Sequence, residues 1–226
     1  MTWIKICGTT NERDADVAIR AGANALGFIM TRSPRQVSDS TAYSVGTIVP
    51  KSVETIGVFV NEELKTLVET TRFCKFTGVQ LHGDEDPAYI DRLRVELAGV
   101  KILKAVPAAS LNGSTASNPD VWLIDNAHGA QRGGTGKTFN WRESASRIRK
   151  LRQPVIIAGG LNSQNVQEAL GIFHPWGVDV VSGVESYPGR KHPGLVAQFI
   201  DAVRQFDSRQ RAAKTPAQKG IVGEAD

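Results

Sequence analysis

The sequence has only two cysteines and no long apolar run. Cys7 and Cys74 alone, in 226 residues, exclude a disulfide scaffold and any zinc site that needs several thiolates. So few thiols are typical of a protein of the reducing cytoplasm. No apolar run approaches the roughly 18 residues of a membrane helix, and no secretory signal is visible at the N-terminus. We therefore expect a cytoplasmic protein with no membrane partner.

A strong charge of one sign is also lacking. Lys and Arg number 27 and Asp and Glu number 23, so the formal net charge is only +4. This surplus does not indicate a nucleic-acid partner, and it fits an enzyme of anionic small molecules equally well. About half of the chain is apolar, which excludes disorder and is typical of a globular domain.

Short apolar runs alternate with helical patterns along the chain. Most of the runs are continuous rather than alternating, which is typical of parallel strands covered on both faces. The expected strands are Trp3–Ile6, Ala25–Ile29, Thr55–Val60, Gly78–Leu81, Val100–Val106, Val121–Ile124, Pro154–Ala158 and Val178–Val181. The expected helices are Asn11–Ala21, Asp39–Thr47, Glu62–Thr71, Pro87–Leu97, Trp141–Leu151, Ser163–Gly171 and Pro193–Phe206.

This order predicts a single-domain α/β protein, a (β/α)₈ TIM barrel over residues 1–206. A doubly wound open sheet is the alternative, but polar or glycine motifs follow nearly every strand, as in a barrel with a ring of loops at one rim. The segment 107–120 is rich in Ala, Ser, Asn, Gly and Pro, so the helix after strand five is expected to be poor or absent. Residues 207–226 lack apolar periodicity and are expected to form a disordered tail.

The first expected strand runs into Lys5-Ile6-Cys7-Gly8. Residues two apart on a strand share a face, so Lys5 and Cys7 point the same way, which is inward in a barrel. A thiol at that rim serves as nucleophile or proton acceptor once it is ionised, and a nearby ammonium lowers its pKa. The alternative is a buried small hydrophobic side chain.

The sixth expected strand ends at Asp125. A carboxylate at the carboxyl end of a barrel strand is a catalytic candidate, with a structural cap as the alternative. The long loop after it holds Gly133-Gly134-Thr135-Gly136-Lys137, whose spacing does not fit a Walker A motif. We interpret this loop as a lid over the site.

Two glycine motifs follow the last two expected strands. Gly159-Gly160 follows strand seven, and Ser182-Gly183 follows strand eight and opens a short extra helix. Backbone N–H groups in such turns approach a phosphate closely. The pair predicts a phosphate site, with ordinary tight turns as the alternative.

Three further polar residues lie on or near the expected rim. Asp179 lies inside an apolar strand and therefore needs a partner, either a substrate hydroxyl or a barrel lysine such as Lys5. His82 shares a strand face with Gln80 and is interpreted as a residue that lines the site. Arg35, in the loop after strand two, is expected to grip a carboxylate bidentately, with a surface arginine as the alternative.

Together these motifs resemble those of the phosphoribosylanthranilate isomerase family of tryptophan biosynthesis. The resemblance covers about residues 3–205 in the right order. It is carried by Lys5–Gly8, Gly27-Phe28, Ser33-Pro34-Arg35, Gly78–Gly83, Gly133–Lys137 with Phe139 and Trp141, Ala158–Leu161, Ser182–Glu185, Pro188-Gly189 and Lys191.

The resemblance implies an Amadori rearrangement of N-(5-phosphoribosyl)anthranilate to the 1-deoxyribulose form, with no cofactor and no metal. Asp125 matches the family's general acid and Cys7 its general base. Arg35 matches the residue that holds the anthranilate carboxylate, and Asp179 matches a ribose contact. Backbone groups around Gly160, Ser182 and Gly183 match the phosphate cradle. For this chemistry we expect the pKa of Cys7 to be lowered by Lys5, and the pKa of Asp125 to be raised by an apolar environment or hydrogen bonds.

Three alternatives stay open at this point. The related aminoimidazole isomerase of histidine biosynthesis resembles this family, but it has an acidic residue where Cys7 stands. A ribulose-phosphate epimerase needs metal-binding His and Asp at several strand ends, and only His82 lies at such a place. A non-catalytic phosphate-binding barrel predicts the loss of one catalytic partner, yet Cys7 and Asp125 are both present. The partner is therefore expected to be a small phosphorylated molecule, and the chain a monomer, with a dimer as the alternative.

Overall fold

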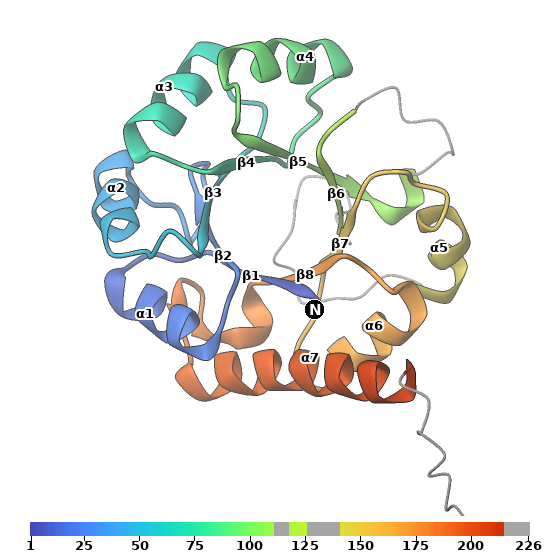
Figure 1. Cartoon of the computed structure of the whole chain (residues 1–226). Helices are drawn as coiled ribbons and strands as arrows, with labels where there is room; N and C mark the ends of the chain where they lie inside the picture. The colour runs from blue at the N-terminus through green and yellow to red at the C-terminus, as the bar shows by residue number, and fades with distance from the viewer. Residues whose placement is uncertain (111–117, 126–140, 215–226) are drawn as a thin grey trace, which may run out of the picture.

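The computed structural model describes residues 1–110, 118–125 and 141–214. Eight parallel strands form a closed barrel in which each strand pairs with its neighbours in sequence and β8 pairs with β1 (Figure 1). This confirms the predicted (β/α)₈ barrel over the open sheet. The strands are β1 (Trp3–Cys7), β2 (Ala25–Ile29), β3 (Glu54–Phe59), β4 (Gly78–Leu81), β5 (Lys101–Pro107), β6 (Val121–Asp125), β7 (Val155–Ile157) and β8 (Gly177–Val180).

Helices surround the ring of strands (Figure 1). As predicted, Asn11 caps the first helix, because its side chain accepts a hydrogen bond from the backbone N–H of Asp14. The third helix begins later than predicted, since Asn61 adopts a left-handed φ of 51° and Glu63 provides the cap. The helices are α1 (Glu12–Ala21), α2 (Asp39–Thr47), α3 (Leu64–Cys74), α4 (Pro87–Glu96), α5 (Trp141–Ile148), α6 (Val166–Phe173) and α7 (Pro193–Lys214).

The core has two parts because the side chains of each strand alternate between its two faces. Outward-facing residues pack against the helices in one large cluster. A second cluster fills the inside of the barrel, and it includes Trp3 of β1 and Leu123 of β6. Cys7 lies four residues after Trp3, and Asp125 lies two residues after Leu123. Their side chains therefore point to the same inner face, at the carboxyl ends of their strands.

Four short elements lie outside the main strands and helices, and one of them was predicted. A 3₁₀ helix, η1 (Ala108–Ser110), follows β5, and residues 111–117 lie outside the described part of the chain. A second, η2 (Ser182–Val184), is the short helix expected after β8. It leads into β9 (Glu185–Tyr187), which pairs antiparallel with β10 (Arg190–Lys191).

The last helix runs past the predicted end at Phe206. α7 continues to Lys214, so the boundary between helix and tail at 206/207 was wrong for residues 207–214, while residues 215–226 lie outside the described part. Asp207 explains the extension, because its carboxylate accepts hydrogen bonds from the backbone N–H and the hydroxyl of Thr2 at 2.8 and 2.7 Å. Arg204 also donates to the Thr2 carbonyl. A tertiary contact with the N-terminus thus supports a segment that has no apolar stripe of its own.

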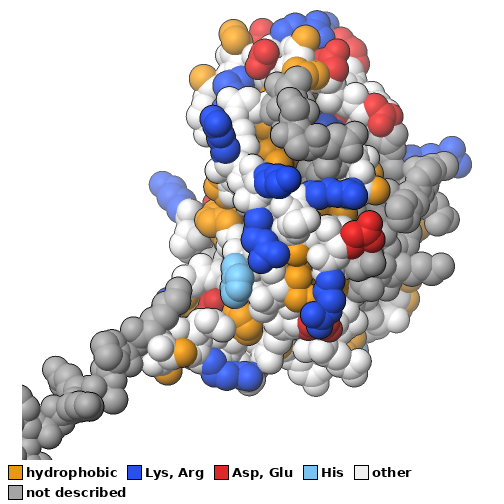
Figure 2. Space-filling view, turned by 90° about the vertical axis from the view of Figure 1, so that its right-hand side faces the viewer, with side chains coloured by type: hydrophobic (Ala, Val, Ile, Leu, Met, Phe, Trp, Pro, Cys, Tyr) orange, Lys and Arg blue, Asp and Glu red, His pale blue; other side chains and the backbone are white. Residues whose placement is uncertain are grey.

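No helix in the described ranges combines the length and apolar character needed to cross a membrane. Lys and Arg side chains gather on the face over α5 and α6, which lies on the right of Figure 1 and faces the viewer in Figure 2. The exposed basic residues of α5 and the turn after it are Arg142, Arg147, Arg149, Lys150 and Arg152.

Candidate functional site

Cys7 lies at the carboxyl end of β1, where it is 3% exposed. Lys5 is fully buried below it on the same inner face, and its Nζ lies 3.0 Å from Oδ1 of Asp179 on β8. Of the two partners proposed for Asp179, the structure provides the lysine. Gly27 on β2 leaves room for the thiol, since a Cβ at that position would lie 2.5 Å from Cys7 Sγ.

The environment of Cys7 raises its pKa. Burial is the largest cause, Asp179 acts in the same direction, and Lys5 and Lys191 only partly offset them. The expectation of a net lowered pKa for Cys7 was therefore wrong, because the cost of removing a thiolate from water exceeds the benefit of the ammonium. For Lys5, burial disfavours the charged form, but Asp179 and Cys7 more than compensate and its pKa is raised.

Asp125 lies at the end of β6 and is 6% exposed. Its Oδ2 lies 3.4 Å from Nε2 of His82, the residue directly after β4. Gln80 holds the other side of this ring, with its Nε2 at 2.9 Å from His82 Nδ1. The structure thus brings together the predicted acid and the predicted lining histidine, and Gln80 orients the imidazole.

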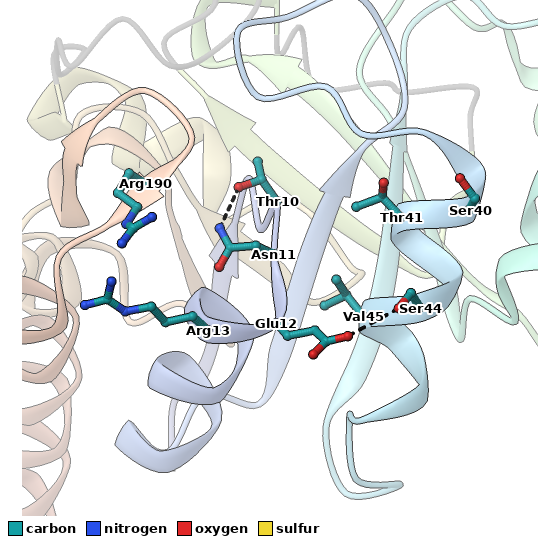
Figure 3. A pocket seen from close by; sticks show the side chains of 9 residues that line it. All are labelled: Thr10, Asn11, Glu12, Arg13, Ser40, Thr41, Ser44, Val45 and Arg190. Carbon is teal, nitrogen blue, oxygen red and sulfur yellow. Dashed lines mark hydrogen bonds between the residues drawn. The ribbon is translucent and has the colours of Figure 1, made fainter.

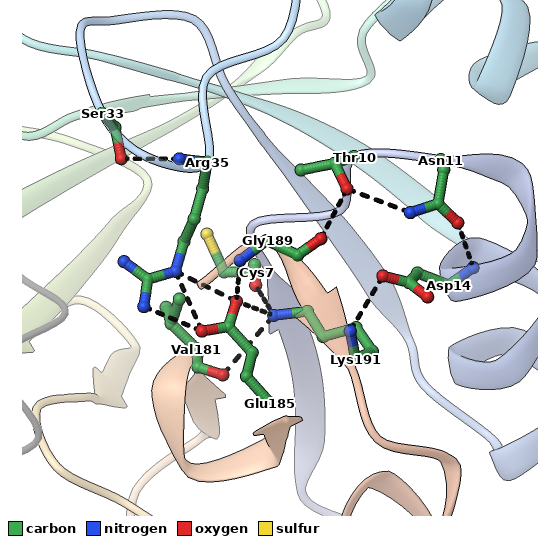
Figure 4. Close-up of polar contacts among 10 residues, drawn as sticks. All are labelled: Cys7, Thr10, Asn11, Asp14, Ser33, Arg35, Val181, Glu185, Gly189 and Lys191. Atoms are coloured by element: carbon green, nitrogen blue, oxygen red, sulfur yellow. Dashed lines mark hydrogen bonds and ion pairs between the residues drawn. The ribbon is translucent and has the colours of Figure 1, made fainter. Parts of the chain in front are cut away.

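Arg35 lies in the loop after β2 and makes a bidentate ion pair with Glu185 at the start of β9 (Figure 4). Nε and Nη2 of Arg35 lie between 2.8 and 3.0 Å from the two carboxylate oxygens. Lys191 of β10, whose side chain is fully buried, donates to Glu185 Oε1 at 3.1 Å and to the carbonyl of Cys7. Arg35 is therefore anchored at the barrel rim rather than free on the surface.

The loops after β7 and β8 pack closely together. Gly159 and Gly160 have φ values of 82° and 70°, in the left-handed region that favours glycine. Gly183 approaches the Leu161 carbonyl so closely that a Cβ would lie 2.0 Å from that oxygen. The two glycine motifs predicted as one phosphate site, which includes Ser182, therefore lie side by side at the rim.

Sequence reasoning assigned no individual role to Glu185, to Lys191 or to the buried ion pair of Lys104 and Glu85. Lys104 of β5 donates to the carbonyl of Gly83 at 2.8 Å and to Glu85 at 3.0 Å. The sequence could have indicated Lys104, because a lysine within an apolar strand needs a partner just as Asp179 does. The loop 133–137, interpreted as a lid, lies outside the described residues.

A groove of about 640 Å³ lies beside the barrel rather than at its mouth (Figure 3). It lies between the start of α1 and helix α2, with Arg13 and Arg190 near its α1 side. Cys7, His82 and Asp125 do not line it. The groove is therefore separate from the groups at the strand ends.

The eight strands form a closed ring that carries a thiol, a carboxyl group and paired glycine turns at its carboxyl rim. These are the features of a (β/α)₈-barrel enzyme, since such enzymes have their active sites at that rim. The family model for N-(5'-phosphoribosyl)anthranilate (PRA) isomerase matches residues 4–202, and the chain belongs to this family.

Relatives and solved structures agree with this assignment. The N-(5'-phosphoribosyl)anthranilate isomerase of Moorella thermoacetica is 38% identical over 226 residues, which cover 99% of this chain and 100% of the relative. Phosphoribosyl anthranilate isomerase of Thermotoga maritima superposes with a TM-score of 0.81 at 31% identity, over 91% of this chain and 100% of that one. A phosphoribosyl anthranilate isomerase in complex with reduced 1-(o-carboxyphenylamino)-1-deoxyribulose 5-phosphate gives a TM-score of 0.78 at 30% identity, with the same coverage.

Proposed function

We propose that this protein catalyses the Amadori rearrangement of N-(5-phosphoribosyl)anthranilate to 1-(2-carboxyphenylamino)-1-deoxyribulose 5-phosphate, a step of tryptophan biosynthesis. Family membership supports the substrate, and so does the relative that binds the reduced product. The observation that carries the mechanism is the presence of Cys7 and Asp125 at inward positions of one rim, both nearly buried.

Asp125 is the general acid. It protonates the ring oxygen of the ribose, the bond from C1′ to that oxygen breaks, and the nitrogen lone pair forms the C1′=N bond of a protonated Schiff base. His82, at 3.4 Å from the carboxyl group, orients Asp125 towards the sugar. General acid catalysis of this kind contributes typically about 10²- to 10⁴-fold in rate.

Cys7 is the general base. The raised pKa of Cys7 keeps its ionised fraction small at neutral pH. This thiolate fraction removes the proton from C2′, so that a C1′=C2′ bond forms and the C1′=N electron pair returns to nitrogen. The resulting enolamine becomes the ketone when the proton of the C2′ hydroxyl is lost and C1′ gains a proton. Return of a proton from Cys7 to Asp125 through solvent restores the starting enzyme.

The remaining residues at the rim bind the two charged ends of the substrate. The guanidinium of Arg35 holds the anthranilate carboxylate, because its planar fork matches a carboxylate. Backbone N–H groups of Gly159, Gly160, Ser182 and Gly183 hold the phosphate, since the glycines allow close approach. Asp179 contacts the ribose while it stays paired with Lys5.

The test is turnover of freshly prepared N-(5-phosphoribosyl)anthranilate, followed by the loss of its fluorescence. We expect turnover by the wild type, and a loss of at least about 10²-fold in kcat for Cys7→Ala and for Asp125→Asn. Cys74→Ala is the matched control, because Cys74 is a buried thiol on α3 that belongs to the cluster between strands and helices rather than to the inside of the barrel. An inactive wild type, or full activity in either catalytic variant, would refute the proposal. The aminoimidazole substrate in a parallel assay tests the histidine-pathway reaction.

We also propose that the protein acts as a monomer in the cytoplasm. Both cysteines are free thiols, which supports a reducing compartment. Among the exposed large apolar side chains, Met1, Val95 and Tyr187 come from different parts of the chain, and Tyr43 of α2 and Phe73 of α3 contact each other with ring centroids 5.4 Å apart. Light scattering coupled to gel filtration tests this proposal, and a stable dimer mass would contradict it.

A further inference from the structure

The anchored state of Arg35 bears on how this barrel recognises a carboxylate. Glu185 occupies one edge of the guanidinium, formed by Nε and Nη2. Nη1 of Arg35 has no hydrogen-bond partner within the described ranges. An arginine offers N–H groups along two edges, so pairing along one edge leaves the end formed by Nη1 and Nη2 for a second carboxylate.

Glu185 itself is firmly held. Its side chain is 3% exposed, and besides Arg35 it accepts hydrogen bonds from Lys191 Nζ at 3.1 Å and from the backbone N–H of Gly189 at 3.2 Å. Burial alone would raise the pKa of Glu185, but Arg35 and Lys191 more than offset it and the pKa is lowered, so the carboxylate stays charged. A carboxylate with this many donors is costly to displace, because each donor would be left without its partner.

Lys191 connects this anchor to the catalytic strand (Figure 4). Its Nζ donates to the carbonyl of Cys7 and lies 3.4 Å from the carbonyl of Val181, at the ends of β1 and β8. Its backbone N–H donates to Asp14 at 2.8 Å. The aliphatic part of Arg35 crosses Gly8, where a Cβ would lie 3.0 Å from Arg35 Cδ. Cys7 and the guanidinium are thereby connected through one buried lysine and one carboxylate.

We propose that Glu185 is a positioning residue for carboxylate recognition, which holds Arg35 so that the Nη1–Nη2 end faces the ligand, while Lys191 aligns Glu185 with the end of β1. The inference rests on the proposed function for the identity of the carboxylate, that of the anthranilate ring. A competing idea is that Glu185 occupies the ligand's place and must be displaced, and it predicts the opposite effect of removing the charge.

Two ligands separate these ideas by binding alone. One is reduced 1-(o-carboxyphenylamino)-1-deoxyribulose 5-phosphate, and the other is the same compound without the ring carboxylate. We expect Glu185→Gln to weaken binding of the first by roughly tenfold, the size of one charge-assisted hydrogen bond, and to leave the second unchanged. With substrate, KM rises in the same proportion while kcat changes less than about twofold.

Arg35 and a surface pair provide the controls. Arg35→Ala should remove the preference for the carboxylate-bearing ligand, and Glu185→Gln added to it should have no further effect. Arg35→Lys keeps the charge but loses the fork, and it should also reduce the preference. Glu96→Gln is the matched control, since Glu96 pairs with Arg72 at 3.3 Å on the exposed surface and should change nothing.

The outcomes are distinct. Equal weakening of both ligands by Glu185→Gln, or no weakening of either, overturns the positioning role, and tighter binding of the carboxylate ligand establishes displacement instead. A wild type that binds neither ligand nor turns over substrate refutes the proposed function. A wild type that is active, with Glu185→Gln unchanged, refutes only this inference.

Discussion

Lys5 and Asp179 lie directly opposite each other in the register of β1 and β8, and their side chains form an ion pair of 3.0 Å inside the barrel. The side chains are 0% and 6% exposed. A buried pair is costly to break by removing one partner, because the other charge is left uncompensated. The pair therefore joins the strands that close the barrel and also sets the charges around Cys7.

Lys5→Met is expected to lower the free energy of unfolding by about 3–5 kcal/mol, because it leaves Asp179 buried without its partner. Urea denaturation followed by circular dichroism measures this change. Lys65→Met is the control, since Lys65 is 76% exposed and lies 4.0 Å from Glu69, a pair worth at most about 0.5 kcal/mol. Because the pKa of Lys5 is raised on folding, its contribution should be complete below about pH 10 and be lost only as pH rises beyond that. Similar losses in the two variants would contradict the prediction.

The thiol of Cys7 is expected to ionise above the usual pKa of about 8.5. Asp179→Asn removes a negative charge that raises this pKa, so the midpoint should move to lower pH, whereas Lys5→Met should move it higher. The thiolate absorbance measures the midpoint in a Cys74→Ala background, because burial raises the pKa of Cys74 to about 11 and its signal would overlap. A midpoint below 8.5 in the wild type, or shifts of the opposite sign, would show that burial does not dominate this site.

Gly27→Ala should disturb Cys7 more than it disturbs the fold. A Cβ at Gly27 would lie 2.5 Å from Cys7 Sγ and 3.0 Å from Lys5 Cε, so the thiol must move. We expect a loss of stability of about 1–3 kcal/mol from overpacking, together with a loss of kcat that exceeds the change in KM. Gly46→Ala in α2 is the control, since its Cβ would lie 3.7 Å from the nearest atom and alanine favours a helix. An unchanged kcat in Gly27→Ala would show that catalysis does not depend on the position of the thiol.

Asp207→Ala tests the contact that extends α7. Loss of two hydrogen bonds to Thr2 should cost about 1–2 kcal/mol. The same denaturation measurement on Asp201→Ala, an exposed position of the same helix, serves as control and should show little change. Equal stability of the Asp207 variant and the wild type would mean that the helix beyond Phe206 adds nothing to the fold.

Local patterns were sufficient for much of the fold. The strands Ala25–Ile29 and Gly78–Leu81 and the helix Asp39–Thr47 were predicted with the bounds that the structure has, because apolar runs and caps act over a few residues. The end of α7 was missed, since Asp207 depends on Thr2, which lies 205 residues away in sequence.

The same distinction between local and long-range information applies to the candidate site. The end of a strand and the face of each side chain follow from the alternation of side chains along the strand, so Cys7, Asp125 and His82 could be selected from the sequence. The partner of Arg35 could not, because Glu185 lies 150 residues away and reaches it only through the β9–β10 hairpin.

The order of strands and helices, the glycine turns and the chemical groups at the strand ends were determined by the sequence alone, because hydrophobic periodicity and backbone conformation are local properties. Closure of the barrel determined which charged groups became partners and how deeply each group was buried. It brought β8 beside β1 and so paired Lys5 with Asp179, and it buried Cys7 deeply enough to raise its pKa against the nearby ammonium. Desolvation depends on everything that surrounds a group, and that is established only when the chain is folded.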